Sequence, residues 1–327
     1  RAPRIPRARR ERTGVRMAGL RFLGRTAPRH PGGGSGSGSG ALATPSLGAG
    51  RGFEARVAPI FRTLLGGHVA IIGRTGCGKT TLARILAATS PNTIIVDWDG
   101  EYVDLGLPVM EPPFLLPDTD LAALVSNLER PREGGHGIAA ALQVAAELNN
   151  EAEPTTLEEF FKLLRRYAFQ GAAPQWVHAA LARLAVLRKY CVLGVDVSPP
   201  LVYYLSKITS VRERAIIQQA IATAVVLSRP LNPPDEILLV IEEGAMGATA
   251  EYLKDLIVLS RRRNTKLIWI SQSLPPTELL TSFTLLIGDP GPLRHEWSRL
   301  LGLPIPELRR GEFLLYDGKT VRKVRVT

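Results

Sequence analysis

The chain has 327 residues, of which 45% are hydrophobic and 22% charged, and its formal net charge is +11. This is the composition of a soluble globular protein, and no run of 18 or more apolar residues is present that could cross a bilayer. The only two cysteines, Cys77 and Cys191, exclude a disulfide framework and a cysteine-based metal site.

The positive charge is concentrated at the start of the chain. Residues 1–31 contain ten arginines and one glutamate, a net charge of +9, so the remaining residues are close to neutral. This basic segment has no sustained hydrophobic period and is interrupted by prolines, which is typical of a disordered or conditionally ordered region. The high overall charge therefore does not by itself indicate a nucleic-acid surface on the folded part.

A linker of pure glycine and serine, GGGSGSGSG, follows at residues 32–40. Such a sequence behaves as a flexible coil with no preferred fold. The first residue of the chain is arginine rather than methionine, so we expect the sequence to begin inside a longer parent protein or after a removed tag.

Residues 41–106 contain the first strands and a helix. HVAIIG (His68–Gly73) is a short apolar run that ends in glycine, and the residues after it have the apolar spacing of a helix. NTIIVDWDGEY (Asn92–Tyr102) predicts a second buried strand that ends in acidic residues.

Residues 107–200 change character. Four segments with helix-period apolar residues predict an all-helical insertion into the fold. One of these helices begins with a predicted capping box, in which Thr155 and Glu158 satisfy the first backbone N–H groups behind Pro154.

Strands return in residues 201–327 and alternate with helical segments. Near-continuous apolar strands of this kind predict an α/β fold whose mostly parallel sheet is covered on both faces. The expected strands are Leu201–Ser206, Glu236–Glu243, Thr265–Ser273, Phe283–Asp289 and Gly311–Gly318.

A phosphate-binding loop is predicted between the first strand and its helix. GRTGCGKTT satisfies the pattern G-x-x-x-x-G-K-[ST], in which backbone N–H groups and a helix N-terminus cradle phosphates. Lys79 would supply a cation to the γ-phosphate and the Thr80 hydroxyl a ligand to Mg²⁺, so ATP and Mg²⁺ are the predicted cofactors. Cys77 occupies a variable position, and its side chain is assigned no role. The residues expected to form the nucleotide site are Gly73, Thr75, Gly76, Cys77, Gly78, Lys79, Thr80 and Thr81.

Acidic and amide side chains follow two later strands. ILLVIEEG delivers Glu242 and Glu243 to a strand end, where we assign Glu242 to metal support and Glu243 to the general base that orients the attacking water. Gln272 ends the next strand, a suitable place for an amide that senses the γ-phosphate. The alternative interpretation is a solvated acidic strand end.

These motifs, together with VDWDGEY and the late strand Arg310–Leu314, resemble the HerA/FtsK superfamily of hexameric DNA-pumping ATPases, which includes the type IV secretion ATPases. The resemblance covers about residues 66–104 and 201–318, and the helical block falls where these proteins carry a variable insertion. It implies a RecA-like P-loop core that assembles into a homo-hexameric ring, binds DNA, and places Asp97 and Glu101 near the nucleotide. The double Glu departs from the Asp-Glu pair of the family, and we expect the extra methylene of Glu242 to move the metal contact outward or to require a slightly retracted strand.

Several branches of this superfamily, including conjugation coupling proteins and the archaeal DNA-import (Ced) motor, look like membrane-anchored ATPases with an N-terminal transmembrane hairpin. Residues 1–31 suit the cytoplasmic flank of such a helix. We therefore expect an engineered linker that replaces a membrane segment, in a parent protein that contacts the cell membrane, or a membrane-channel protein, from its cytoplasmic face. The alternative is a natural linker to a disordered tail that binds phosphate backbones.

Three functions fit these features. The first is a membrane-linked DNA translocase in DNA import or conjugation. The second is a soluble motor of the same superfamily, for viral genome packaging or DNA-end processing, and the third is a nucleotide-gated assembly scaffold.

A catalytic arginine acting on the nucleotide of a neighbouring subunit is also expected. Arg261, Arg262 and Arg263, at the end of a helix, are the main candidates, and Arg212 and Arg214 form a second group. The alternative is a solvated basic helix end that the helix dipole favours.

Overall fold

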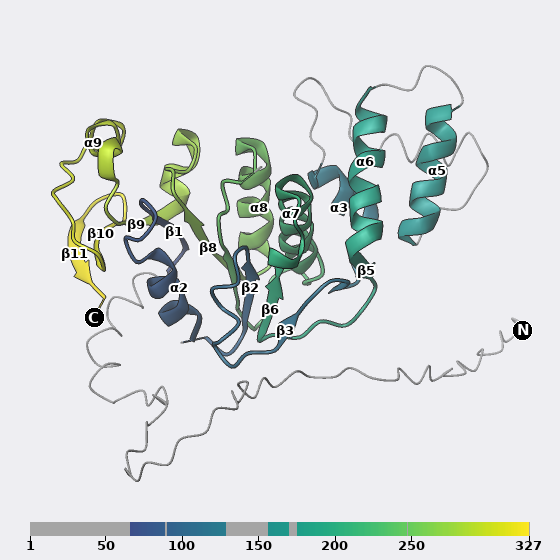
Figure 1. The fold of residues 1–327 in the computed structure, drawn as a ribbon, viewed down its shortest axis with the longest axis horizontal. Coiled ribbons are helices and arrows are strands. Elements are labelled where there is room, and N and C mark those ends of the chain that lie inside the picture. Colours follow the sequence, from purple (N-terminus) through teal and green to yellow (C-terminus); the bar gives the residue numbers. More distant parts are fainter. Residues whose placement is uncertain (1–65, 89, 129–155, 170–174, 247, 327) are drawn as a thin grey trace, which may run out of the picture. The chain divides into compact units, whose positions relative to one another are not determined.

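The structure is a computed structural model, and Figure 1 shows its fold. It describes residues 66–88, 90–128, 156–169, 175–246 and 248–326. Three predicted segments lie outside the described residues: the basic segment 1–31, the linker 32–40 and residues 137–150, one of the four helical segments predicted in the insertion. Within the described ranges, no helix combines the length and the apolar composition that a bilayer crossing requires.

Nine strands form the central sheet. They are β1 (His68–Ile72), β2 (Thr93–Asp97), β3 (Val109–Met110), β6 (Leu201–Tyr204), β7 (Ile237–Ile241), β8 (Thr265–Ser271), β9 (Phe283–Ile287), β10 (Glu312–Tyr316) and β11 (Val321–Arg325). Their order is β11-β10-β9-β1-β8-β7-β2-β6-β3. All neighbours from β9 to β3 pair in parallel, whereas β10 and β11 add an antiparallel edge. The predicted α/β fold with a mostly parallel sheet is confirmed.

Helices cover both faces of this sheet. In the view of Figure 1, α7 (Val211–Leu227) and α8 (Ala250–Arg262) lie above the sheet and α2 (Lys79–Ala88) lies below it. Alternate residues of one strand therefore enter different cores: Ile71 packs in the cluster that contains α2, and Ile72 in the cluster that contains α7 and α8. Burial on both faces explains why the strands are continuously apolar rather than alternating.

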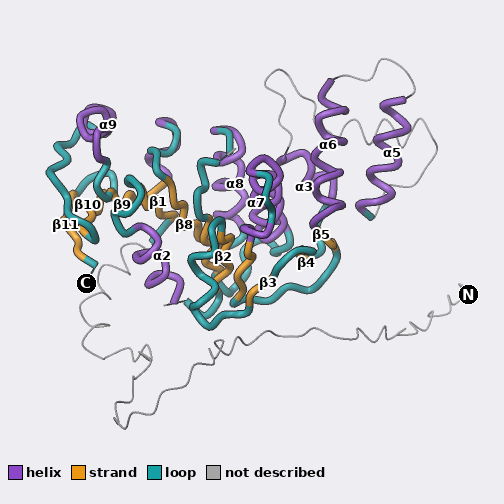
Figure 2. Tube along the Cα trace, in the orientation of Figure 1, coloured by secondary structure: helices purple, strands orange, loops and turns teal. Residues whose placement is uncertain are grey.

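The insertion at residues 107–200 is not all-helical. Its described part contains α3 (Leu121–Leu128), α5 (Leu157–Phe169) and α6 (Gln175–Tyr190), but also β3, β4 (Phe114–Leu116) and β5 (Cys191–Leu193). The last two strands pair in parallel as a separate two-stranded sheet, and Figure 2 shows them beside the helices. Strands of two or three residues are too short for a hydrophobic period to reveal.

The capping box of α5 lies one residue later than predicted. Thr156 Oγ1 accepts the backbone N–H of Glu159 at 3.2 Å, and Glu159 Oε2 accepts the N–H of Thr156 at 3.2 Å. The sequence allows this register and the predicted one equally. Glu158 is instead ion-paired with Arg188 of α6 at 2.6 Å.

Leu239→Ala should destabilise the fold strongly, because Leu239 is fully buried in β7 between β8 and β2. We expect the free energy of unfolding to fall by about 3 kcal/mol in equilibrium denaturant unfolding, as for other buried Leu→Ala changes. Val321→Ala on the exposed edge strand β11 is the control and should cost no more than about 0.5 kcal/mol. Equal losses for the two variants would contradict this sheet order.

Candidate active site

The strand order brings the predicted motifs to one edge of the sheet. β1, β8, β7 and β2 are consecutive parallel neighbours, so their carboxyl ends lie side by side. The glycine-rich loop follows β1, Gln272 follows β8, and the acidic pair follows β7. In open α/β sheets this edge is where ligands bind.

The loop after β1 has the conformation that phosphate binding requires. Gly73, Gly76 and Gly78 have φ values of 152°, 81° and 105°, a region that side chains disfavour. The ammonium of Lys79 donates to the carbonyl oxygens of Gly73 at 2.9 Å and Arg74 at 3.1 Å. Lysine has three N–H donors, so this cation is held over the loop with one donor left for a further acceptor.

Cys77 contributes its backbone to the loop and its side chain to the core. A Cβ placed on Gly73 or on Gly288 would lie 2.7 Å from Cys77 Sγ, so the thiol fills the space between these two glycines. Burial raises the pKa of the thiol above its usual value. The side chain therefore packs the loop against the end of β9.

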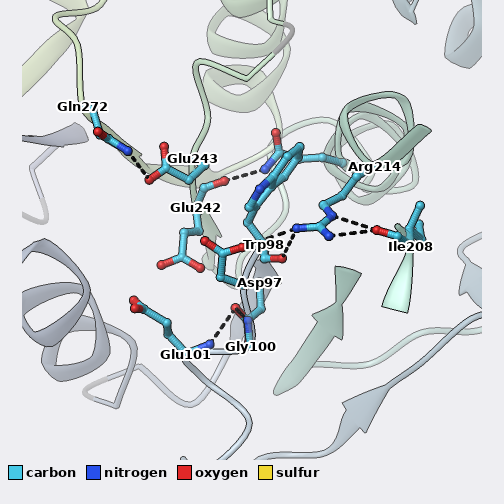
Figure 3. Close-up of polar contacts among 11 residues, drawn as sticks. Asp97, Trp98, Gly100, Glu101, Ile208, Arg214, Glu242, Glu243 and Gln272 are labelled. Atoms are coloured by element: carbon cyan, nitrogen blue, oxygen red, sulfur yellow. Dashed lines mark hydrogen bonds and ion pairs between the residues drawn. The ribbon is translucent and has the colours of Figure 1, made fainter. Parts of the chain in front are cut away.

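Glu242 is buried at the end of β7, beside the phosphate loop. The hydroxyl of Thr80 donates to its Oε1 at 3.2 Å, while its Oε2 is buried without a hydrogen-bond partner. Desolvation and the neighbouring carboxylates of Asp97 and Glu101 raise the pKa of Glu242 to about 9. Figure 3 shows the three carboxyl groups directed toward one region.

Asp97 organises the turn that follows β2. Its Oδ1 accepts the N–H groups of Gly100 at 2.8 Å and Glu101 at 3.1 Å, and its Oδ2 accepts that of Tyr102 at 3.0 Å. These hydrogen bonds favour the ionised form of Asp97, although burial opposes them and raises its pKa. In this buried pair the carboxylate with three N–H donors is Asp97, so Glu242 is the group that holds the proton.

The unpartnered oxygen of Glu242 and the Thr80 hydroxyl fit a hard divalent cation. Mg²⁺ is bound by oxygen ligands and commonly takes only one or two from the protein, with phosphates and waters supplying the rest. In the described part of the chain, no group of three or more His, Cys, Asp or Glu residues is arranged to hold a metal alone. The site therefore suits a cation that arrives with phosphate.

Glu243 faces a different group of residues. Gln272 Nε2 donates to Glu243 Oε1 at 3.1 Å, and the hydroxyl of Thr75 donates to Gln272 Oε1 at 3.2 Å. This chain of hydrogen bonds joins the phosphate loop to the ends of β8 and β7. Glu243 has a φ of 46°, a left-handed conformation rare for a residue with a side chain, and such strain is found at functional sites. Glu242 and Glu243 are therefore adjacent in sequence but serve separate positions.

Two residues of α7 support the site: Gln218, which the sequence did not mark, and Arg214, which the sequence marked only as a candidate for acting on a neighbouring subunit. Gln218 is buried and its amide donates to the backbone carbonyl of Glu242. Arg214 donates to the carbonyl oxygens of Ile208 at 2.8 Å and Trp98 at 3.1 Å, and its guanidinium lies over the Trp98 ring. Figure 3 shows the hydrogen bonds of Arg214 to Ile208 and Trp98. The only sequence signal for Gln218 was that it is one of two glutamines that interrupt an apolar helix.

The predicted arginine candidates occupy different places. Arg261, Arg262 and Arg263 end α8 just before β8 begins, at the opposite edge of the sheet from the phosphate loop. They do not join the site of their own chain, and action on a neighbouring subunit stays a prediction. Arg214 is used within the chain, as described above, whereas Arg212 is exposed.

Glu242→Gln should change how stability depends on pH. The folded-state pKa of about 9 lies above the ordinary value of 4.5, so the folded chain keeps a proton that the unfolded chain releases. The stabilisation from this bound proton is complete at pH values below 4.5, and it is lost as the pH rises toward about 9. Measured without nucleotide or divalent cation, the parent should lose stability relative to the variant from about pH 5 to about pH 9. Glu242→Asp keeps a carboxyl group and should keep this trend, and parallel profiles for parent and Gln variant would contradict the assignment.

Two solved structures share this fold. VirB4 of Thermoanaerobacter pseudethanolicus aligns with a TM-score of 0.57 and 17% identity over 80% of this chain and 89% of VirB4. The plasmid coupling protein TrwB in complex with ADP and Mg²⁺ aligns with a TM-score of 0.50 and 16% identity over 80% of this chain and 85% of TrwB. At these identities the likeness establishes the fold alone. No curated protein sequence matches this chain.

The sequence family described as the central domain of the helicase HerA matches residues 59–224, about half of the chain. The match includes the phosphate loop, the DWDGEY turn, the insertion and most of α7, and it ends before β7. The chain belongs to this HerA central-domain family, within the HerA/FtsK superfamily that includes the type IV secretion and conjugation ATPases.

Proposed function

We propose that the chain hydrolyses ATP as the motor of a DNA-translocating machine of the conjugation type. The observation that carries the proposal is the hydrogen-bonded chain Thr75–Gln272–Glu243, which spans the phosphate loop and the acid strand. It links the position of a γ-phosphate to the carboxylate that would orient the attacking water. TrwB, which has the same fold, has been solved with ADP and Mg²⁺, and this supports nucleotide and metal binding at the corresponding loop.

Each group then has one role in the reaction. Lys79 and the loop N–H groups hold the phosphates, and Thr80 and Glu242 hold Mg²⁺, which would neutralise phosphate charge. Glu243 accepts the proton of the attacking water. Gln272 contacts both Thr75 and Glu243, so it couples the γ-phosphate to the base.

The assembly we propose is a homo-hexameric ring that threads DNA. Membership of the HerA/FtsK superfamily supports it, and so does the exposed position of Arg261 and Arg262, which leaves them accessible to a neighbour. We also propose that the basic segment 1–31 links the motor to the cytoplasmic face of the cell membrane, in DNA import or conjugation. The near-neutral charge of residues 32–327 implies that DNA contacts are local rather than spread over the surface.

Lys79→Ala and Glu243→Gln should separate nucleotide binding from hydrolysis. Lys79→Ala removes the cation of the phosphate loop, so steady-state ATP turnover should be abolished. Glu243→Gln keeps the loop intact but lacks the base, so ATP should still bind while turnover falls about a hundredfold or more. If the ATP turnover rate of Lys79→Ala lies within about threefold of the parent's, the phosphate-loop assignment is refuted, because removing a typical transition-state contact lowers the rate much further.

A second outcome tests the order of the two acids. If Glu242→Gln is the variant that retains ATP without hydrolysing it, the roles of Glu242 and Glu243 are reversed. If the parent binds ATP but does not turn it over with or without DNA, a nucleotide-gated scaffold replaces the motor.

A trans-acting arginine should make activity depend on assembly. Turnover per subunit should rise with protein concentration as rings form, because each nucleotide then meets an arginine of the next subunit. Lys79→Ala subunits mixed with subunits that lack the critical arginine should recover activity, since one type of interface pairs an intact loop with an intact arginine. The candidates to test are Arg212, Arg261, Arg262 and Arg263. Concentration-independent turnover together with no recovery in any mixture would exclude this mechanism.

A further inference from the structure

The turn before β10 lies directly against the phosphate loop. The N–H of Gly311 donates to the carbonyl oxygen of Cys77 at 2.9 Å. A Cβ placed on Gly78 would lie 3.4 Å from the same nitrogen. The turn Arg309–Glu312, far from the loop in sequence, is thus in backbone contact with the part of the loop that cradles phosphates.

This turn is firmly anchored. Glu312 Oε2 accepts the N–H of Arg309 at 2.9 Å and forms an ion pair with Lys323 of β11 at 2.9 Å. The carbonyl of Gly311 accepts the N–H of Val326 at 2.8 Å, and a Cβ on Gly311 would lie 2.9 Å from the Val326 oxygen. With a φ of 79°, Gly311 is the residue type that this approach requires. The Cα of the preceding residue is therefore held in place, about 3.8 Å from that of Gly311.

That preceding residue is Arg310, whose charge has no partner in the described part of the chain. Its side chain is exposed, and no hydrogen bond or ion pair to it is present among the described residues. The nearest acid in sequence, Glu312, is already engaged by Lys323 and the Arg309 N–H. Three other arginines near the site are paired: Arg74 with Asp289, Arg84 with Asp104 and Arg214 with Asp99.

We infer that Arg310 is a nucleotide-positioning residue that acts in cis, with its guanidinium on the α- and β-phosphates of the nucleotide held by the loop. The inference rests on the proposed ATP site. The loop N–H groups around Gly78 cradle these two phosphates, and the anchored turn holds Arg310 next to that segment. A planar guanidinium matches phosphate oxygens with paired N–H donors, which an ammonium does not. This role differs from that of an arginine of a neighbouring subunit, which would contact the γ-phosphate.

The test is Mg²⁺-ADP binding to the full chain by calorimetry, with Arg310→Ala, Arg310→Lys and Arg322→Ala. Arg322 is the matched control, because it is exposed and basic on the adjacent strand β11. Arg310→Ala should weaken ADP binding by about tenfold to a hundredfold, the size expected for lost charge-assisted hydrogen bonds. Arg310→Lys should recover part of the loss, and Arg322→Ala should bind within about twofold of the parent.

Thermal unfolding separates this role from a structural one. Without nucleotide, Arg310→Ala should unfold at the temperature of the parent, and the stabilisation by ADP should be reduced in proportion to the weaker binding. Parental ADP affinity in Arg310→Ala overturns the inference while leaving the proposed function intact. A loss seen with a non-hydrolysable ATP analogue but not with ADP overturns the α- and β-phosphate assignment. Failure of the parent itself to bind Mg²⁺-ADP overturns both the inference and the proposed function.

Discussion

Two buried carboxyl groups, Asp97 and Glu242, meet at the carboxyl edge of adjacent strands β2 and β7, and much of the surrounding structure accommodates them. Charge in such a position is unfavourable unless it is paired, hydrogen-bonded or neutralised. Three N–H groups of the DWDGEY turn stabilise Asp97, and a proton neutralises Glu242. Without a cation, ionising both carboxyl groups is therefore unfavourable, and a bound cation would stabilise the ionised pair.

The turn that serves Asp97 is held from two sides of the sheet. Arg214 of α7 fixes the carbonyl of Trp98, and Arg84 of α2 fixes that of Glu101 at 2.9 Å. Gln218 of α7 holds the backbone of Glu242 in the same way. Because α2 begins at the phosphate loop, these hydrogen bonds connect the loop, the turn and the end of β7 through α2 and α7.

The phosphate loop also has contacts on its other side. Cys77 packs between Gly73 and Gly288, and its carbonyl accepts the N–H of Gly311 from the turn before β10. The antiparallel strands β10 and β11 are therefore part of the site rather than a separate appendage, although their motif was only a family resemblance in the sequence. This contact is what makes Arg310 available to a bound nucleotide.

The sequence alone determined the strand–loop–helix unit at Gly73–Thr81, the apolar strands and the mostly parallel sheet. These features are local: hydrophobic period and glycine spacing depend on nearby residues, and continuous apolar runs report burial on both faces. The same reasoning found Glu242, Glu243 and Gln272, because acidic and amide residues at strand ends meet at one edge whatever the strand order.

What required tertiary structure was the partner of each side chain. The sequence predicted a capping box of Thr155 and Glu158, whereas the structure forms it with Thr156 and Glu159 and pairs Glu158 with Arg188. It also grouped Arg214 with the catalytic candidates, whereas contacts with Trp98 and Ile208 show it to be an anchor of the turn. The short strands β3, β4 and β5 were missed, because pairing with distant strands rather than their own pattern stabilises them, and β11, an exposed strand that pairs with its neighbour β10, was missed as well. Hydrogen bonds and ion pairs between residues far apart in sequence leave no period along the chain, so only the folded structure could decide them.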